Sequence, residues 1–147
     1  MPGSGARFPL EKGFFNTASV ADPGTNADIS WTPPANLIVM PLTFSCLLFA
    51  ANAGVVRPVT VSVNIPTGTV LWRVQHPVSQ PINTTLGYSG SVNGGLLNVA
   101  SISNYEFPLP EVYLTSADNF TFAFGQKQAT DRITAFRISF LEFRNTP

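Results

Sequence analysis

The sequence contains few charged residues, one cysteine and one histidine. Charged residues make up 11% of its 147 residues, and the formal net charge is zero, whereas an average soluble domain is about 25% charged. A chain with this balance is not expected to bind nucleic acid or an anionic membrane by general electrostatic attraction. Because Cys46 and His76 are each alone of their kind, the sequence excludes a disulfide framework and any metal site built from several thiols or imidazoles.

Motifs of the common catalytic sites are also missing. No G-x-S-x-G elbow supports a triad around His76, for which we expect an exposed structural role. No glycine-rich phosphate cradle and no cluster of oxygen ligands for calcium is present. Glu106 and Glu111 flank a proline-containing segment, and turn capping accounts for Asp118 and Asp131 better than glycoside hydrolysis does. The sequence therefore predicts no catalytic, cofactor-binding or metal-binding residue, and we expect the protein not to be an enzyme.

Long hydrophobic runs are missing as well. Residues Met1 to Arg7 lack the apolar core of a signal peptide. No run approaches the roughly 20 apolar residues of a membrane span. We therefore expect a protein that is made in a cytoplasm and does not enter a membrane.

Alternation of apolar and polar residues is the strongest pattern that is present. Val59, Val61 and Val63 alternate with polar residues, and Val70 to Val74 repeat the pattern after the turn residues Pro66-Thr67-Gly68. A period of two is typical of a half-buried β-strand, and two such runs across a short Pro/Gly loop predict a β-hairpin. The hairpin over 57–75 is the element around which the remaining strands are expected to assemble.

Further apolar runs predict the rest of an all-β fold. Strands are expected at 42–51, 120–124 and 133–143, although a buried helix competes for the first of these. Pro41 is expected to end a preceding strand, and 76–95 is expected to be a long polar loop that includes a short strand near Thr84 to Tyr88. Eight to ten short strands without a helix predict a single-domain antiparallel β-sandwich over 13–147, jelly-roll-like in connectivity.

Two groups of residues are expected to bind partners. Residues 1–12 are too poor in apolar residues to pack alone, and we interpret them as an extended N-terminal arm that docks through Phe8 and Leu10. The alternative is that this arm adds an edge strand to its own sandwich. Leu47 and Phe49 place apolar side chains on the second face of their strand, which predicts coverage by another subunit and therefore a homo-oligomer.

The order of the segments resembles a known group of proteins. An apolar double run leads through the hairpin to the segments Leu109-Pro110, Asp131-Arg132-Ile133 and Leu141-Glu142-Phe143. Over residues 36–143 this order is similar to that of small β-sandwich virion structural proteins of tailed bacteriophages. The resemblance implies a virion component, and we expect a capsid cement (decoration) subunit that binds and stabilises the shell of major capsid protein, with a trimer favoured. The alternative is a carbohydrate-binding tail, fibre or neck module, which would need exposed aromatic residues along a groove near 76–95.

Overall fold

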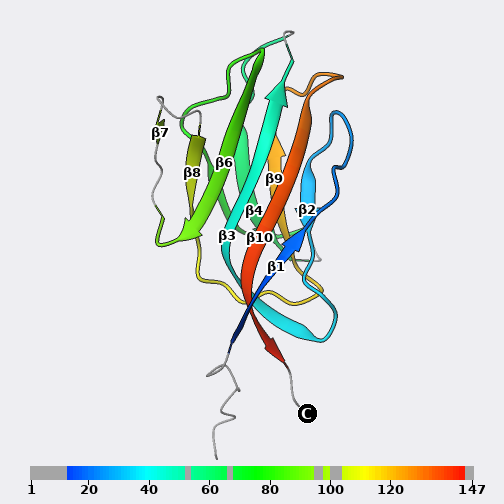
Figure 1. The fold of residues 1–147 in the computed structure, drawn as a ribbon, viewed down its shortest axis with the longest axis vertical. Helices are drawn as coiled ribbons and strands as arrows, with labels where there is room; N and C mark the ends of the chain where they lie inside the picture. The colour runs from blue at the N-terminus through cyan, green and yellow to red at the C-terminus, as the bar shows by residue number, and fades with distance from the viewer. Residues whose placement is uncertain (1–12, 52–53, 66–67, 95–97, 100–103, 145–147) are drawn as a thin grey trace, which may run out of the picture.

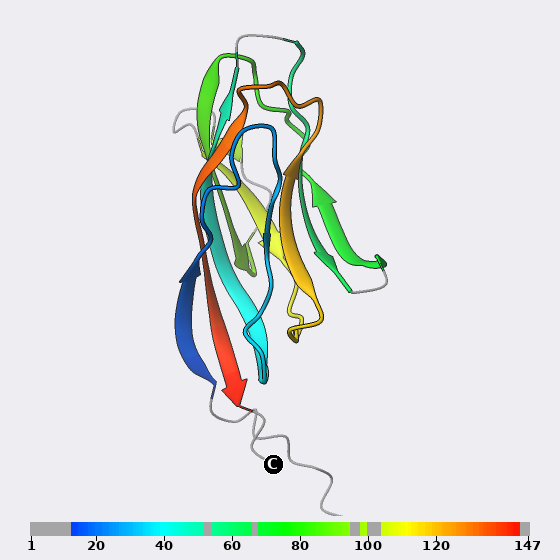
Figure 2. The same ribbon diagram turned by 90° about the vertical axis from the view of Figure 1, so that its right-hand side faces the viewer.

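Ten strands form two sheets that pack face to face. The computed structural model describes residues 13–51, 54–65, 68–94, 98–99 and 104–144, so the predicted arm over 1–12 lies outside the described residues. The strands are β1 (Phe14–Ser19), β2 (Ile29–Trp31), β3 (Leu37–Ala50), β4 (Val59–Asn64), β5 (Val70–Gln75), β6 (Thr84–Val92), β7 (Asn98–Val99), β8 (Asn104–Leu109), β9 (Asn119–Phe124) and β10 (Arg132–Arg144). Figure 1 views the larger sheet face on, and Figure 2 shows the two layers from the side.

The pairing of the strands is nested. The larger sheet has the order β1-β10-β3-β6-β8-β7, and the smaller has the order β2-β9-β4-β5. Apart from β7 and β8, the first strand pairs with the last, β2 with β9, β3 with β6, and β4 with β5. A chain that pairs in this way while alternating between two sheets forms a jelly roll. The predicted all-β, jelly-roll-like sandwich is therefore confirmed.

One pair of strands departs from the expected antiparallel arrangement. β8 runs parallel to β6, and β7 pairs with β8 antiparallel on the other side. After β6 the chain passes to the margin of the sheet, forms β7 and returns as β8 between β6 and β7. Pro108 lies where β8 extends beyond β7, and a residue without an amide donor is tolerated at such an edge.

Phe44 is the centre of the core. Its ring lies within 5.4–6.3 Å, between centroids, of the rings of Phe107, Phe120, Phe122 and Phe136. These five side chains come from four strands of both sheets, and each is at most 2% exposed. Aromatic pairs of this kind contribute about 0.5–1.5 kcal/mol each beyond the burial of their area. The alternating pattern of the sequence thus identified the inner faces correctly.

The predicted hairpin is also confirmed. β4 and β5 pair antiparallel, with Val61 opposite Val74 and Val63 opposite Trp72. Val59, Val61 and Val63 are fully buried, whereas Val70 is 39% exposed because β5 is the edge of the smaller sheet. The predicted apolar face is therefore buried in β4, where Ser62 is buried as well, and the side chains of β5 are more exposed.

Two strand boundaries differ from the sequence-based expectation. β3 continues through Pro41 instead of ending there, because Pro41 falls at a register shift against β10, where a ladder hydrogen bond is dispensable. The short strand expected near 84–88 within the loop over 76–95 is longer than expected, because β6 has nine residues and continues to Val92. Gly90 weakens the apolar pattern of this strand in the sequence, because it has no side chain. The same glycine makes room for the ring of Phe44, which a Cβ at position 90 would overlap.

Candidate functional site

The outer face of the six-stranded sheet carries a row of small polar residues between two opposite charges. On β3, Ser45 pairs with Arg137 of β10 on one side and with Ser89 of β6 on the other, and Ser89 pairs with Glu106 of β8. Paired residues of neighbouring strands project from the same face. The row therefore runs Arg137, Ser45, Ser89, Glu106 across four strands.

The rows on either side of this one are also populated by small residues. One consists of Ser139, Thr43, Ser91 and Pro108, and the other of Thr134, Leu47, Gly87 and Asn104. Leu47 is the largest apolar side chain of these rows and is 43% exposed. The middle of the face is thus low and hydroxyl-rich, with one projecting leucine.

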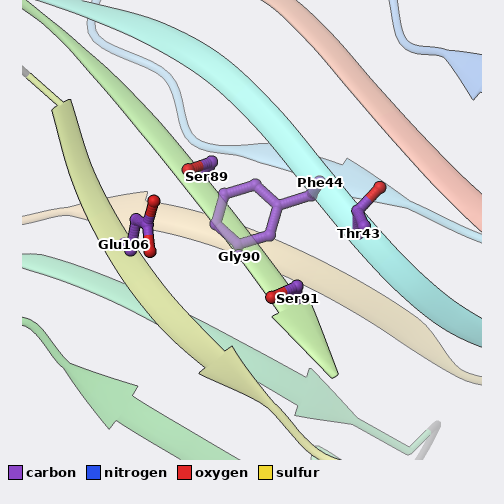
Figure 3. Close-up of a pocket in the computed structure, with 6 residues that line it drawn as sticks. All are labelled: Thr43, Phe44, Ser89, Gly90, Ser91 and Glu106. Atoms are coloured by element: carbon purple, nitrogen blue, oxygen red, sulfur yellow. The ribbon is translucent and has the colours of Figure 1, made fainter. Parts of the chain in front are cut away.

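A shallow depression of about 250 Å³ lies over β3, β6 and β8. Its lining residues are Thr43, Phe44, Ser89, Gly90, Ser91 and Glu106 (Figure 3). The hydroxyl groups and the Glu106 carboxylate can accept hydrogen bonds, and a carboxylate attracts a cationic donor most strongly. The depression is therefore suited to a group that donates several hydrogen bonds.

The predicted partner-binding residues divide into two sets. Leu47 and Phe49 do lie on the outer face, 43% and 40% exposed, next to the row that contains Ser45. Phe8 and Leu10 lie outside the described residues. The structure therefore brings Leu47 and Phe49 onto one surface with Glu106 and with Arg137, and the sequence analysis did not predict that these four residues share a face.

The edge strand β1 presents a second apolar surface that the sequence analysis missed. Phe14 and Phe15 are 60% and 67% exposed, at the end of the sheet where the start of β1 pairs with the last residues of β10 (Figure 1). Among the described strands, β1 pairs with β10 alone, so its outer edge keeps unpaired backbone groups. Adjacent residues of a strand point to opposite faces, so two neighbouring phenylalanines were a signal that at least one faces outward.

The acidic side chains near turns have structural partners. Asp131 is fully buried and binds Arg57, with 2.8 Å from Nε to Oδ2 and 3.0 Å from Nη2 to Oδ1. It also accepts the amides of Ala51 and Gln128 at 2.8 Å. Asp118 accepts the amide of Thr115 at 2.8 Å, as turn capping predicts. For Asp131 the expectation of turn capping was incomplete, because its main partner is Arg57, which lies 74 residues earlier in the chain.

His76 is buried, so the expectation of an exposed position is wrong. It is 1% exposed, and its ring lies 4.6 Å from that of Tyr105 and 5.3 Å from that of Phe107, between centroids. The amide of Val78 lies 3.1 Å from Nδ1 and can donate to it. Strand β8 covers the His76 side chain. The local sequence around His76 does not show that β8 packs beside it.

Cys46 and Tyr88 are further buried polar groups of the core. Burial raises the pKa of the Cys46 thiol, which makes it a poor nucleophile. The Tyr88 hydroxyl donates to Gln80 Oε1 at 2.9 Å, and Gln80 Nε2 donates to the carbonyl of Leu48 at 2.8 Å. These contacts tie the loop before β6 to the core.

In the described part of the chain, no group of three or more His, Cys, Asp or Glu residues is placed to hold a metal ion. No helix in that part is long and apolar enough to cross a membrane. Comparison of the chain with protein-family models, curated proteins and solved structures found no match.

Proposed function

We propose that this protein is a structural subunit of a virion that binds the shell of major capsid protein as a cement subunit. The observation that carries the proposal is the pair of exposed phenylalanines on the unpaired edge of β1. An exposed, apolar strand edge is a hazard for a free monomer and a ready-made site for another chain. The resemblance in segment order to phage virion proteins supplies the identity of that other chain.

Binding along β1 would combine two sources of affinity. The unpaired amides and carbonyls of β1 can extend a sheet into the partner, while Phe14 and Phe15 provide apolar anchors. Aromatic anchors dominate the energy of many interfaces. The low share of charged residues, 11%, is consistent with a surface that is partly covered in the assembly.

The carbohydrate-binding alternative has less support. It needs exposed aromatic residues along the segment 76–95, and the one aromatic residue of that segment, Tyr88, is 1% exposed. The depression over β3, β6 and β8 is lined by hydroxyl groups and a carboxylate, and its one aromatic ring, Phe44, belongs to the core. Sugar binding usually uses an aromatic face, which this surface does not offer in the described residues.

The proposal is tested by binding to shells assembled from the major capsid protein of the virus that encodes this chain. We expect the full chain to co-sediment with the shells saturably. The double variant Phe14→Thr/Phe15→Thr should bind at least about tenfold more weakly, since each anchor is worth more than about 1 kcal/mol.

Leu71→Thr is the matched control, because Leu71 is 54% exposed on the other sheet. This variant should bind the shells as the wild type does. Absence of wild-type binding would reject the cement role, and binding to a glycan array without binding to shells would favour the carbohydrate alternative.

A further inference from the structure

The two charges of the central row have no charged partner of their own. Arg137 is exposed and Glu106 is partly exposed, and neither makes an ion pair with any residue that the structure describes. They are three strand spacings apart, or about 14 Å. At this separation the two charges of one copy do not form an ion pair with each other, so both are available to opposite charges of another molecule.

We propose that a second copy of this chain docks on the outer face of the six-stranded sheet. The two copies are related by a two-fold axis that lies in the interface, parallel to the strands and midway between β3 and β6. Arg137 and Glu106 lie at equal distances from this axis, because β10 is the neighbour of β3 on one side and β8 is the neighbour of β6 on the other. The axis therefore brings Arg137 of each copy opposite Glu106 of the other, as an isologous contact requires.

The remaining side chains of the face match under the same axis. Leu47 pairs in register with Gly87 within one copy, so the axis places the projecting Leu47 of one copy over Gly87 of the other. Ser45 comes to face Ser89 in the same way. Large groups then meet small ones and hydroxyls meet hydroxyls, which is the complementarity that a stable interface needs.

The depression receives the arginine in this arrangement. Three of its lining residues, Ser89, Ser91 and Glu106, lie on the β6 and β8 side of the axis, and Thr43 lies across the axis on β3. Arg137 of the second copy lies opposite the β8 side, where Glu106 is. A guanidinium presents five donors in a planar fork and matches a carboxylate bidentately. In this arrangement the depression of Figure 3 binds the guanidinium of Arg137 from the second copy.

Other symmetries do not satisfy these charges. An in-plane axis perpendicular to the strands would place Arg137 against Arg137 and Glu106 against Glu106, which repel. A three-fold ring joins two different surfaces of each subunit, so it would not pair this face with itself. The inference therefore favours a dimeric contact over the trimer expected from the sequence, and it does not depend on shell binding.

Sedimentation velocity of the purified full chain tests the contact without any capsid component. We expect a species of twice 15.8 kDa that dissociates on dilution and at high salt, because the ion pairs are partly exposed. Arg137→Glu and Glu106→Arg each place like charges together at two symmetry-related positions. Each should weaken the dimer at least about tenfold, and the combined variant should restore it to within about threefold of the wild type.

Arg73→Glu and Leu71→Thr are the controls, because both side chains are exposed on β5 of the other sheet. They should leave the dimer unchanged, whereas Leu47→Thr should weaken it severalfold. A wild type that stays monomeric up to about 100 µM, where an interface of standard size is populated, overturns the inference. A trimer, or charge reversals that the combined variant does not rescue, would overturn it equally.

Discussion

The buried ion pair between Arg57 and Asp131 offers the most decisive test of what holds the jelly roll together. Both side chains are fully buried, and the Asp131 carboxylate accepts two bonds from Arg57 and one each from the amides of Ala51 and Gln128. It thus joins the end of β3, the start of β4 and the start of β10. Asp131→Asn keeps the shape of the side chain but leaves the Arg57 guanidinium without its counter-ion in the interior.

The expected loss for Asp131→Asn is about 3–5 kcal/mol of unfolding free energy, the usual cost of removing one partner of a buried pair. Denaturant titration at pH 7 measures this loss from the shift of the midpoint at constant slope. Asp28→Asn is the control, because the Asp28–Lys127 pair, 2.7 Å apart, is partly exposed and should contribute at most about 1 kcal/mol. A loss below about 1 kcal/mol for Asp131→Asn would refute the structural role assigned to the pair.

The pH dependence of the same variant gives a second check with a definite sign. Burial by itself raises the pKa of Asp131, but the hydrogen bonds from Arg57, Ala51 and Gln128 outweigh it and hold the pKa below its ordinary value. A lowered pKa contributes stability above the unfolded value of about 3.9, and that stability is lost as the pH falls through the folded value. The difference in stability between wild type and Asp131→Asn should therefore be constant above about pH 5 and shrink below about pH 4. A difference that grew on acidification would contradict this assignment.

Two further predictions concern the aromatic core. Phe136→Ala should cost about 3–5 kcal/mol in denaturant titration, because Phe136 is 1% exposed and stacks on Phe44 at 6.3 Å; a loss below about 1 kcal/mol would show that its face is misassigned. Gly90→Ala should cost about 1–3 kcal/mol by overpacking, since its Cβ would overlap the Phe44 ring and lie 3.1 Å from the Phe107 carbonyl oxygen. An unchanged midpoint for Gly90→Ala would mean that Phe44 can move aside.

The success of the sequence analysis follows the strength of the alternating pattern. Val59 to Val63 and Phe120 to Phe124 alternate strictly, and both strands bury every second side chain. In β6 the inner positions include Tyr88 and Gly90, both buried, and glycine has no side chain that could register as apolar. The space there is filled by Phe44 from β3. The pattern of one strand can therefore be completed by a residue of its neighbour, and single-strand periodicity does not detect this.

The candidate site was less predictable, because it depends on register between distant segments. Leu47 and Phe49 were identified from β3 alone, since the second half of that strand is apolar on both faces. Arg137 and Glu106 meet in one row only through three successive pairings, of β10 with β3, β3 with β6 and β6 with β8. The parallel pairing of β8 determines which of its residues lies beside Ser89, and no local signal in the sequence specified it.

The two proposed surfaces can be occupied at the same time. The two-fold axis runs between β3 and β6, whereas β1 lies beyond β10 at the margin of the sheet. A second copy centred on that axis buries Leu47 near the middle of the interface. The outer edge of β1, which begins with Phe14 and Phe15, stays at the periphery of the interface. A dimer would then present two such edges. Because the two edges are linked, the apparent affinity of the dimer for a repeating shell would exceed that of one edge without any new contact. If both proposals hold, Arg137→Glu should keep each β1 edge intact yet lower the apparent shell affinity at low protein concentration, whereas Phe14→Thr/Phe15→Thr should leave the dimer unchanged in sedimentation.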